Sequence, residues 1–359
     1  MTRVASFTIN YTRFVDPSGR AVTALPALAQ DRAALIALYR GMMLIRRFDA
    51  KAIALQRTGR LGTYASSLGQ EAVTVGLASA MRPEDVLLPS YRETGAQIWR
   101  GVSLLELLLY WGGDERGSDF AGPRGDFPVA VPIASQCLHA TGVAYAFKLR
   151  REPRVAVCVC GDGATSNGAF YEAINAAGVW RVPAVFVINN NHWAISMPRS
   201  AQTATATLAQ KAIAAGIPGE QVDGNDAIAV RHLVEHALER ARSGEGPSVV
   251  EALTYRMSDH TTADDASRYR DGEVVSKEWA NDPIARLRTF LGEAGVWSKA
   301  DEERLIDELN REIDEAVERY LATPGQGPEA MFDHLYAELP AALAGQRAAL
   351  AASAGGDHA

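Results

Sequence analysis

The sequence has few cysteines. Its 359 residues include only three, Cys137, Cys158 and Cys160, and these make neither a disulfide framework nor a metal cluster. Cys158 and Cys160 alternate along an apolar run, so we expect them to be small core residues of a strand. This use of cysteine suits a reducing compartment, and we expect the protein to be cytoplasmic.

Long apolar runs and an excess of positive charge are also missing. The longest apolar run, 104–111, is interrupted by Glu106 and is far too short to span a bilayer. Residues 1–20 lack a basic region followed by an apolar core, so we expect no secretory signal. A formal net charge of −7 argues against nucleic acid and anionic membranes as partners. The remaining composition, 47% apolar and 22% charged, is that of a soluble globular enzyme.

The chain shows an arm, one large domain and a tail. Residues 1–30 contain several prolines and glycines and are expected to form an extended arm. Asp31 is a plausible N-cap for a helix that begins the main domain, 31–340, whose C-terminal part is mainly helical. Residues 341–359 are rich in alanine and are expected to fray. A polar segment at 200–207 is expected to be a mobile loop.

A βαβ pattern lies at the centre of the sequence. Two short β-branched runs, 155–160 and 183–188, flank a helix-length segment at 170–180. This is the pattern of two buried parallel strands, and it predicts a doubly wound, mainly parallel α/β sheet. Ligands of such sheets bind beyond the carboxyl ends of the strands. Both ends here carry polar, tight turns, at 161–163 and 189–191.

Asp162 and Asn191 are candidate ligands of a cation. They lie 29 residues apart, a spacing that lets both side chains reach one point beyond the sheet. Mg²⁺ prefers oxygen ligands and is commonly held by one carboxylate, neutral oxygens and phosphates. Gly161 and Gly163 would let the backbone approach a phosphate, and the following helix N-terminus favours an anion. The alternative is that Asp162 only caps that helix and the asparagines only make a turn.

These residues resemble the thiamine-diphosphate motif, GDG followed by NN after just under thirty residues. The surrounding sequence resembles the α subunit of the E1 component of 2-oxo acid dehydrogenase complexes, over about residues 35–340. The segments that carry this resemblance are RLGTYASSLGQEA (60–72), LLPSYRETGAQIWRG (87–101), VDGND (222–226), LTYRMSDHTTADDASRYR (253–270), DPIARLR (282–288) and MFDHLYAELP (331–340).

The resemblance implies a set of ligands for the metal and the diphosphate. Asp162, Asn191 and the backbone carbonyl of Trp193 would bind Mg²⁺. Tyr91 and Arg92 match the family's YR pair, whose guanidinium clamps diphosphate with a planar fork; the alternative is an ordinary surface arginine. The turn of Gly161, Asp162, Gly163 and Ala164 would also contact the cofactor.

Two further residues are implied nearer the reacting end. Ile133 sits where the family places a bulky apolar side chain under the bent cofactor, although simple core packing would select the same residue. His260 matches a histidine near the diphosphate and the entrance, with a role in substrate handling or acyl transfer. Relatives often carry two histidines here, and this chain carries one. Thr261 stands where mitochondrial relatives are phosphorylated.

The resemblance also implies a partner. The family's glutamate that activates the aminopyrimidine lies on a β subunit, so this chain would hold only the diphosphate-and-metal half of the site. We therefore expect an α₂β₂ heterotetramer that oxidatively decarboxylates a 2-oxo acid and passes the acyl group to the lipoyl domain of E2. Pyruvate is favoured as the substrate, because the segments 60–72 and 88–101 look closest to bacterial pyruvate-type α subunits. The segments 253–270 and 331–343 fit an enzyme for a branched-chain 2-oxo acid equally well.

Three other interpretations of the sequence fit it less well. His232, Glu235 and His236 fit the H-x-x-E-H pattern of a zinc hydrolase, but the helix around them is amphipathic and these positions form its polar face. A dinucleotide site fails because Gly168 misses the G-x-G-x-x-G spacing. A non-catalytic thiamine-binding protein would keep the fold but lose Asp162 or the asparagines, and both are present.

Overall fold

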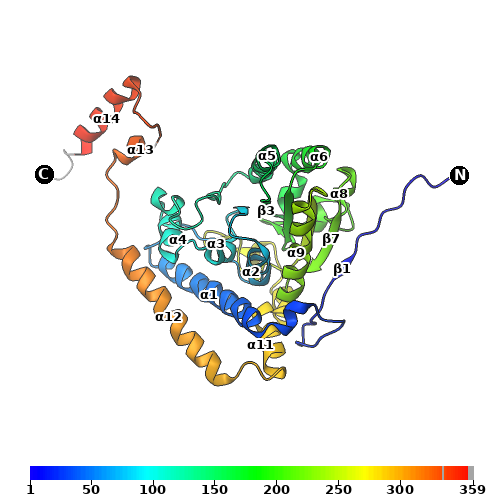
Figure 1. Cartoon of the computed structure of the whole chain (residues 1–359). Coiled ribbons are helices and arrows are strands. Elements are labelled where there is room, and N and C mark those ends of the chain that lie inside the picture. The colour runs from blue at the N-terminus through cyan, green and yellow to red at the C-terminus, as the bar shows by residue number, and fades with distance from the viewer. Residues whose placement is uncertain (334, 355–359) are drawn as a thin grey trace.

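A six-stranded sheet lies at the centre of the computed structural model, which describes residues 1–333 and 335–354 (Figure 1). The strand order is β1-β7-β8-β4-β3-β2, and every neighbouring pair is parallel. This confirms the predicted doubly wound, mainly parallel α/β fold. The strands are β1 Tyr11–Thr12, β2 Val86–Leu88, β3 Ala156–Gly161, β4 Ala184–Asn190, β7 Gly219–Asp223 and β8 Ser248–Leu253.

Helices surround this sheet, and a small hairpin follows β4. The hairpin pairs β5 Trp193–Ala194 with β6 Met197–Pro198. The α-helices are α1 Arg32–Arg57, α2 Glu71–Ala80, α3 Thr94–Arg100, α4 Leu104–Trp111, α5 Ser135–Arg150, α6 Gly168–Trp180, α7 Arg199–Gln202, α8 Lys211–Ala214, α9 Ala227–Arg242, α10 Gly272–Glu278, α11 Pro283–Glu293, α12 Lys299–Ala322, α13 Ala330–Asp333 and α14 Ala341–Ala354. The 3-10 helices are η1 Ala27–Gln30, η2 Glu115–Ser118, η3 Asp162–Ser166, η4 Ala266–Arg268 and η5 Trp279–Asn281.

Two apolar layers lie on opposite faces of the sheet, because alternate residues of a strand point to opposite sides. Cys158 and Ile188 pack into the layer beneath α5 and α6. Val157 and Val187 pack into the layer beneath α2 and α9. All four side chains are fully buried. The predicted βαβ unit is thus β3, α6 and β4, with both strands covered on both faces.

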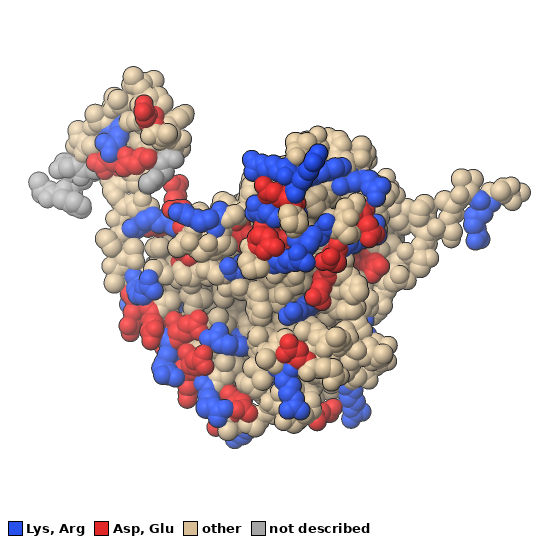
Figure 2. Space-filling view, viewed as in Figure 1, with Lys and Arg blue, Asp and Glu red and all other residues tan. Residues whose placement is uncertain are grey.

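A third layer of helices covers α2 and is built around α1. Asp31 caps α1 as predicted, its Oδ1 accepting a hydrogen bond of 3.0 Å from the N–H of Ala34. The apolar stripe of α1 packs against α11 and α12. Ion pairs join the polar sides of α1 and α12: Arg40 lies 2.7 Å from Glu312, and Lys51 lies 2.6 Å from Asp314. Along α12, acidic and basic side chains alternate on the surface (Figure 2).

The N-terminal arm joins the sheet of its own chain. β1 pairs with β7 at the sheet edge, and the Oδ2 of Asp226 accepts hydrogen bonds of 2.8 and 2.7 Å from the N–H groups of Phe14 and Val15. The other carboxylate oxygen of Asp226 caps α9 by accepting from the N–H groups of Ile228 and Ala229. The start of the chain, by contrast, extends away from the sheet (Figure 1).

The C-terminal segment is ordered differently from the prediction. Residues 341–354 form α14 instead of fraying, because alanine has the highest helix propensity; residues 355–359 lie outside the described residues. Helices α13 and α14 stand apart from the body beyond the end of α12 (Figure 1). None of the helices in the described ranges combines the length and the apolar character needed to cross a membrane.

Candidate active site

A cavity of about 540 Å³ opens beyond the carboxyl ends of β2, β3 and β4. Its walls come from the segments that follow these strands, from the start of α5 and from the loop after β8. Every residue that the sequence analysis selected for cofactor or metal lines this one cavity: Tyr91, Arg92, Ile133, Gly161, Asp162, Gly163, Ala164, Asn191, Trp193 and His260.

Asp162 begins the 3-10 turn η3 directly after β3. Its side chain is buried, with 2% exposure, and its Oδ2 accepts a hydrogen bond of 2.9 Å from the Nε2 of Gln202. Burial raises the pKa of this carboxyl group, and the Gln202 hydrogen bond opposes the rise. No lysine or arginine forms an ion pair with Asp162 within the described residues. A buried carboxylate without a cationic partner is suited to a metal ion.

Asn191 is held rigidly opposite this turn. Its Nδ2 donates a hydrogen bond of 2.9 Å to the Oε1 of Gln70, and its Oδ1 accepts one of 3.1 Å from the N–H of Trp193. His192 between them has a φ of 69°, in the left-handed region, so the chain turns sharply before the β5–β6 hairpin. An amide oxygen has a second lone pair, which leaves Asn191 able to bind a cation.

The two glycines of the turn serve different purposes. A Cβ at Gly163 would lie 2.6 Å from the Cβ of Ala194, so the packing of the hairpin against the turn requires glycine there. A Cβ at Gly161 would meet no atom within 4 Å, and Gly161 lines the cavity. No packing contact within the described residues requires the absence of a side chain at Gly161, and its backbone is open to a bound group.

Arg92 and Arg256 meet at His260. An Nη atom of each arginine lies 3.3 Å from the Nδ1 of His260. A guanidinium can only donate, so Nδ1 is the acceptor and the proton of the neutral ring is on Nε2. Arg92 also donates to the backbone oxygens of Ser66 and His260, at 2.6 and 2.9 Å. Neither arginine forms an ion pair with a carboxylate of the described chain, so their charges are available to an anion.

The environment keeps His260 neutral. Burial, and then the charges of Arg92 and Arg256, lower the pKa of His260 to about 4. The ring of Tyr91 lies edge-on to the imidazole, with centroids 6.0 Å apart. Asp264 accepts a hydrogen bond of 2.8 Å from the N–H of His260 and fixes the loop after β8. The next residue, Thr261, also lines the cavity.

Three buried polar atoms in the cavity wall have no hydrogen-bond partner in the part of the chain that the structure describes: Gln70 Nε2, Gln136 Oε1 and Asn189 Nδ2. Buried amide groups are usually paired, and leaving one unpaired costs about 1–3 kcal/mol. The cavity also has an apolar side chain in its wall. Ile133 is 49% exposed and stands at the mouth of the cavity just before α5. The cavity therefore suits a ligand with both polar and apolar parts.

Residues 39–329 match the family described as the dehydrogenase E1 component. The chain is 40% identical over 337 residues to the pyruvate dehydrogenase E1 component subunit alpha of Staphylococcus aureus, and equally to that of Staphylococcus epidermidis. Each match covers 93% of this chain and 90% of the relative. The chain belongs to the dehydrogenase E1 component family. It is an E1 alpha chain of the 2-oxo acid dehydrogenase type, a component of an oxidoreductase, as the resemblance implied.

Sequence reasoning missed several residues of this E1 alpha site. Arg256 is fully buried and shares His260 with Arg92. Its position just after β8, four residues before the histidine, was a usable signal, since ligands of parallel sheets bind beyond the carboxyl ends of the strands. Gln70 and Gln202 carried no comparable signal. They are neutral side chains, Gln70 at the N-cap of α2 and Gln202 at the end of α7, and only the fold brings them to Asn191 and Asp162.

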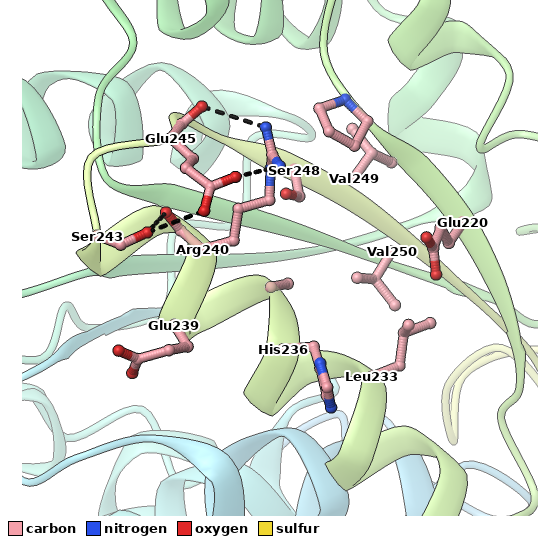
Figure 3. Close-up of a pocket in the computed structure, with 12 residues that line it drawn as sticks. Glu220, Leu233, His236, Glu239, Arg240, Ser243, Glu245, Ser248, Val249 and Val250 are labelled. Carbon is pink, nitrogen blue, oxygen red and sulfur yellow. Dashed lines mark hydrogen bonds and ion pairs between the residues drawn. The ribbon is translucent and has the colours of Figure 1, made fainter. Parts of the chain in front are cut away.

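A second cavity of about 500 Å³ lies at the amino ends of β7 and β8, where these strands face α9 (Figure 3). Of the H-x-x-E-H residues, only His236 lines it. Arg240 there is held by Glu245, with an Nη1 to Oε2 distance of 2.7 Å. No group of three histidine, cysteine, aspartate or glutamate side chains in the described ranges is arranged to hold a metal ion. The helix pattern at 232–236 thus has no third ligand for zinc.

Proposed function

We propose that this E1 alpha chain binds thiamine diphosphate and Mg²⁺ in the cavity beyond β3 and β4. In this proposal it decarboxylates pyruvate oxidatively, together with a β subunit. The observation that carries the proposal is the buried carboxylate of Asp162. Among the described residues it has no cationic partner, and it shares a cavity with Asn191 and with three polar atoms that are unpaired there. An Mg²⁺ ion prefers this set of one carboxylate and neutral oxygens.

The chain's residues would divide the work of holding the cofactor. Asp162, Asn191 and the carbonyl of Trp193 would bind Mg²⁺, and the open backbone at Gly161 would admit the diphosphate. Arg92 would supply positive charge to the same end. Ile133, at the mouth, would support the apolar part of the cofactor. Once bound, thiamine diphosphate supplies the electron sink for decarboxylation, while the protein orients it and excludes water.

His260 is our candidate catalytic residue. Its neutral ring presents Nδ1 to two guanidiniums, so only Nε2 carries a proton that it could donate to a bound oxygen. A neutral donor beside two fixed cations suits the stabilisation of a negatively charged substrate or of charge that develops on it. This role, and the transfer of the acyl group to the lipoyl domain of E2, are inferred from the site and the resemblance.

The β subunit would cover the exposed faces of α5 and α6. Large apolar side chains stand exposed there: Leu138, Tyr145, Leu149, Tyr171, Val179 and Trp180. The rings of Tyr145 and Trp180 lie 4.9 Å apart and join the two helices into one surface. A cluster of exposed apolar side chains is a common mark of a protein interface. Because α5 starts directly after Ile133, a partner on this surface would also close the cavity and complete the α₂β₂ site.

A ferricyanide-coupled decarboxylation assay tests the proposal. The chain would be assayed with and without its co-expressed β subunit, with thiamine diphosphate and Mg²⁺. We expect activity only with the partner, and a higher kcat/KM for pyruvate than for 3-methyl-2-oxobutanoate. A preference for the branched acid would assign the chain to branched-chain substrates instead, and activity of the chain alone would contradict the divided site.

Two aspartate variants sharpen this test. Asp162→Ala should abolish Mg²⁺-dependent cofactor binding and leave the fold intact. Asp307→Ala, at an exposed position of α12, is the control and should bind the cofactor as the wild type does. Equal cofactor affinity of the Asp162 variant and the control would sink the metal assignment.

A further inference from the structure

The segment between β6 and β7 braces the Asp162 turn from two sides. Residues 200–207 were expected to form a mobile loop, but the chain makes the short helix α7 at 199–202 before its irregular part. Arg199 then ties that part down, with an Nη2 to oxygen distance of 2.8 Å to the carbonyl of Ala206. The helices at either end of this segment place one polar side chain each against the turn.

Gln202, at the end of α7, contacts the carboxylate directly. Its Nε2 donates 2.9 Å to the Oδ2 of Asp162 and lies 3.3 Å from the carbonyl oxygen of Met197 in the hairpin. The amide is therefore held between the hairpin and the carboxylate, and it engages one carboxylate oxygen rather than both. A neutral donor orients the carboxylate without adding a positive charge that would compete with a metal ion.

Lys211, at the start of α8, holds the backbone of the same turn. It is buried, with 4% exposure, and its Nζ donates 2.7 Å to the carbonyl of Thr165 and 2.9 Å to the Thr165 hydroxyl. That hydroxyl in turn donates 2.8 Å to the carbonyl of Asp162. The face of the Tyr171 ring lies 5.3 Å from the ammonium. Lys211 has no carboxylate partner within the described residues, although a buried cation is costly without one.

We propose that Gln202 and Lys211 are positioning residues for the metal-binding turn of this E1 alpha chain. Gln202 fixes the direction of the Asp162 carboxylate, and Lys211 fixes the turn's backbone through Thr165. Lys211 also places a positive charge behind the end of the cavity that would hold the diphosphate. This inference rests on the proposed function, because it assigns the two residues to the metal site.

Mn²⁺ in place of Mg²⁺ allows a direct test on the complex with the β subunit. Mn²⁺ affinity would be measured by electron paramagnetic resonance in the presence of thiamine diphosphate, for Gln202→Ala, Lys211→Met and Lys211→Arg. Loss of an outer-shell partner typically weakens metal binding about 10- to 100-fold. We expect a loss in this range for Gln202→Ala and for Lys211→Met, with a broadened Mn²⁺ spectrum. Lys211→Arg should restore most of the affinity, because it keeps the charge and the donors.

The chain offers a matched control for each residue. Gln326 donates 2.8 Å to the Asp114 carboxylate, the same type of contact as that of Gln202, and Lys51 pairs with Asp314 on the outer helices. Gln326→Ala and Lys51→Met should keep the wild-type Mn²⁺ affinity and spectrum.

The outcomes separate three explanations. If Lys211→Met lowers the melting temperature of the complex but keeps the wild-type Mn²⁺ affinity, Lys211 only ties α8 to the turn and its positioning role is refuted. If Gln202→Ala binds Mn²⁺ as tightly as Gln326→Ala does, the role of Gln202 is refuted. If the wild-type complex itself binds neither Mn²⁺ nor thiamine diphosphate, the proposed function fails, and this inference fails with it.

Discussion

Gly161 and Gly163 provide a paired test of the site, since the same substitution should act oppositely at two positions of one turn. Gly161 has a φ of −76° and a ψ of 167°, which alanine adopts without strain, and its Cβ would meet no atom of the protein. Gly161→Ala should therefore stabilise the fold by about 0.4–1 kcal/mol through the unfolded state. At Gly163 the Cβ would clash with Ala194 at 2.6 Å, and overpacking of this kind costs about 1–3 kcal/mol.

Cofactor binding should rank the variants in another order. The methyl group of Gly161→Ala would fill space that the proposed diphosphate occupies, and a clash of about 1–3 kcal/mol corresponds to a roughly five- to 150-fold loss of affinity. Urea unfolding followed by circular dichroism gives the stability, and quenching of Trp193 fluorescence gives the thiamine diphosphate affinity. If Gly161→Ala is stable and binds the cofactor as the wild type does, the diphosphate does not approach this backbone and our reasoning is wrong.

Four further predictions concern other parts of the chain. Burial raises the pKa of Asp49 from 3.8 to about 6. Its contribution to the free energy of unfolding is therefore complete below pH 3.8 and is lost as the pH rises through 6. Asp49→Asn should remove this loss when the free energy of unfolding in urea is measured as a function of pH. The pKa of His260 is lowered to about 4, so its contribution to the free energy of unfolding is lost only as the pH falls from 6.5 towards 4. For the same reason, the pH profile of kcat/KM should show no ionisation of His260 between pH 6 and 8. Glu251 accepts three hydrogen bonds from neutral donors. In Glu251→Gln an NH₂ group replaces one of the accepting oxygens and faces a donor. Urea unfolding should therefore show a free energy of unfolding that is lower by about 1–3 kcal/mol. Val179→Asp, on the exposed face of α6, should prevent association with the β subunit in size-exclusion chromatography, while an unchanged elution of the complex would exclude this face as the interface.

The sheet could be predicted because its strands carry strong local signals. The runs at 155–160 and 183–188 are apolar at successive positions, which is typical of a parallel strand that is covered on both faces. The cap Asp31 marked a helix start at the position observed. The two-residue strand β1 carried no such signal. Its place in the sheet depends on the carboxylate of Asp226, which lies far along the chain.

The ligand-bearing residues were predictable where their type states their chemistry. Asp162 follows a strand between glycines, so general rules and the family resemblance both selected it, while Arg92 was selected by the resemblance. Gln70, Gln202 and Lys211 act through contacts across 40 residues or more of sequence. Their roles come from three-dimensional proximity, and neither periodicity nor composition records it.

The attachment of β1 to the sheet has a consequence for biosynthesis. Phe14 and Val15 bond to a carboxylate 212 and 211 residues further along the chain. At roughly 5–20 residues per second, the ribosome needs about 10 to 40 s to make the intervening stretch. Throughout that time the nascent arm cannot complete its contacts, and α1 likewise waits for α12, the last long helix of the body. The arm and α1 are therefore fastened long after they leave the ribosome, and until then the apolar stripe of α1 is surface that a chaperone would cover.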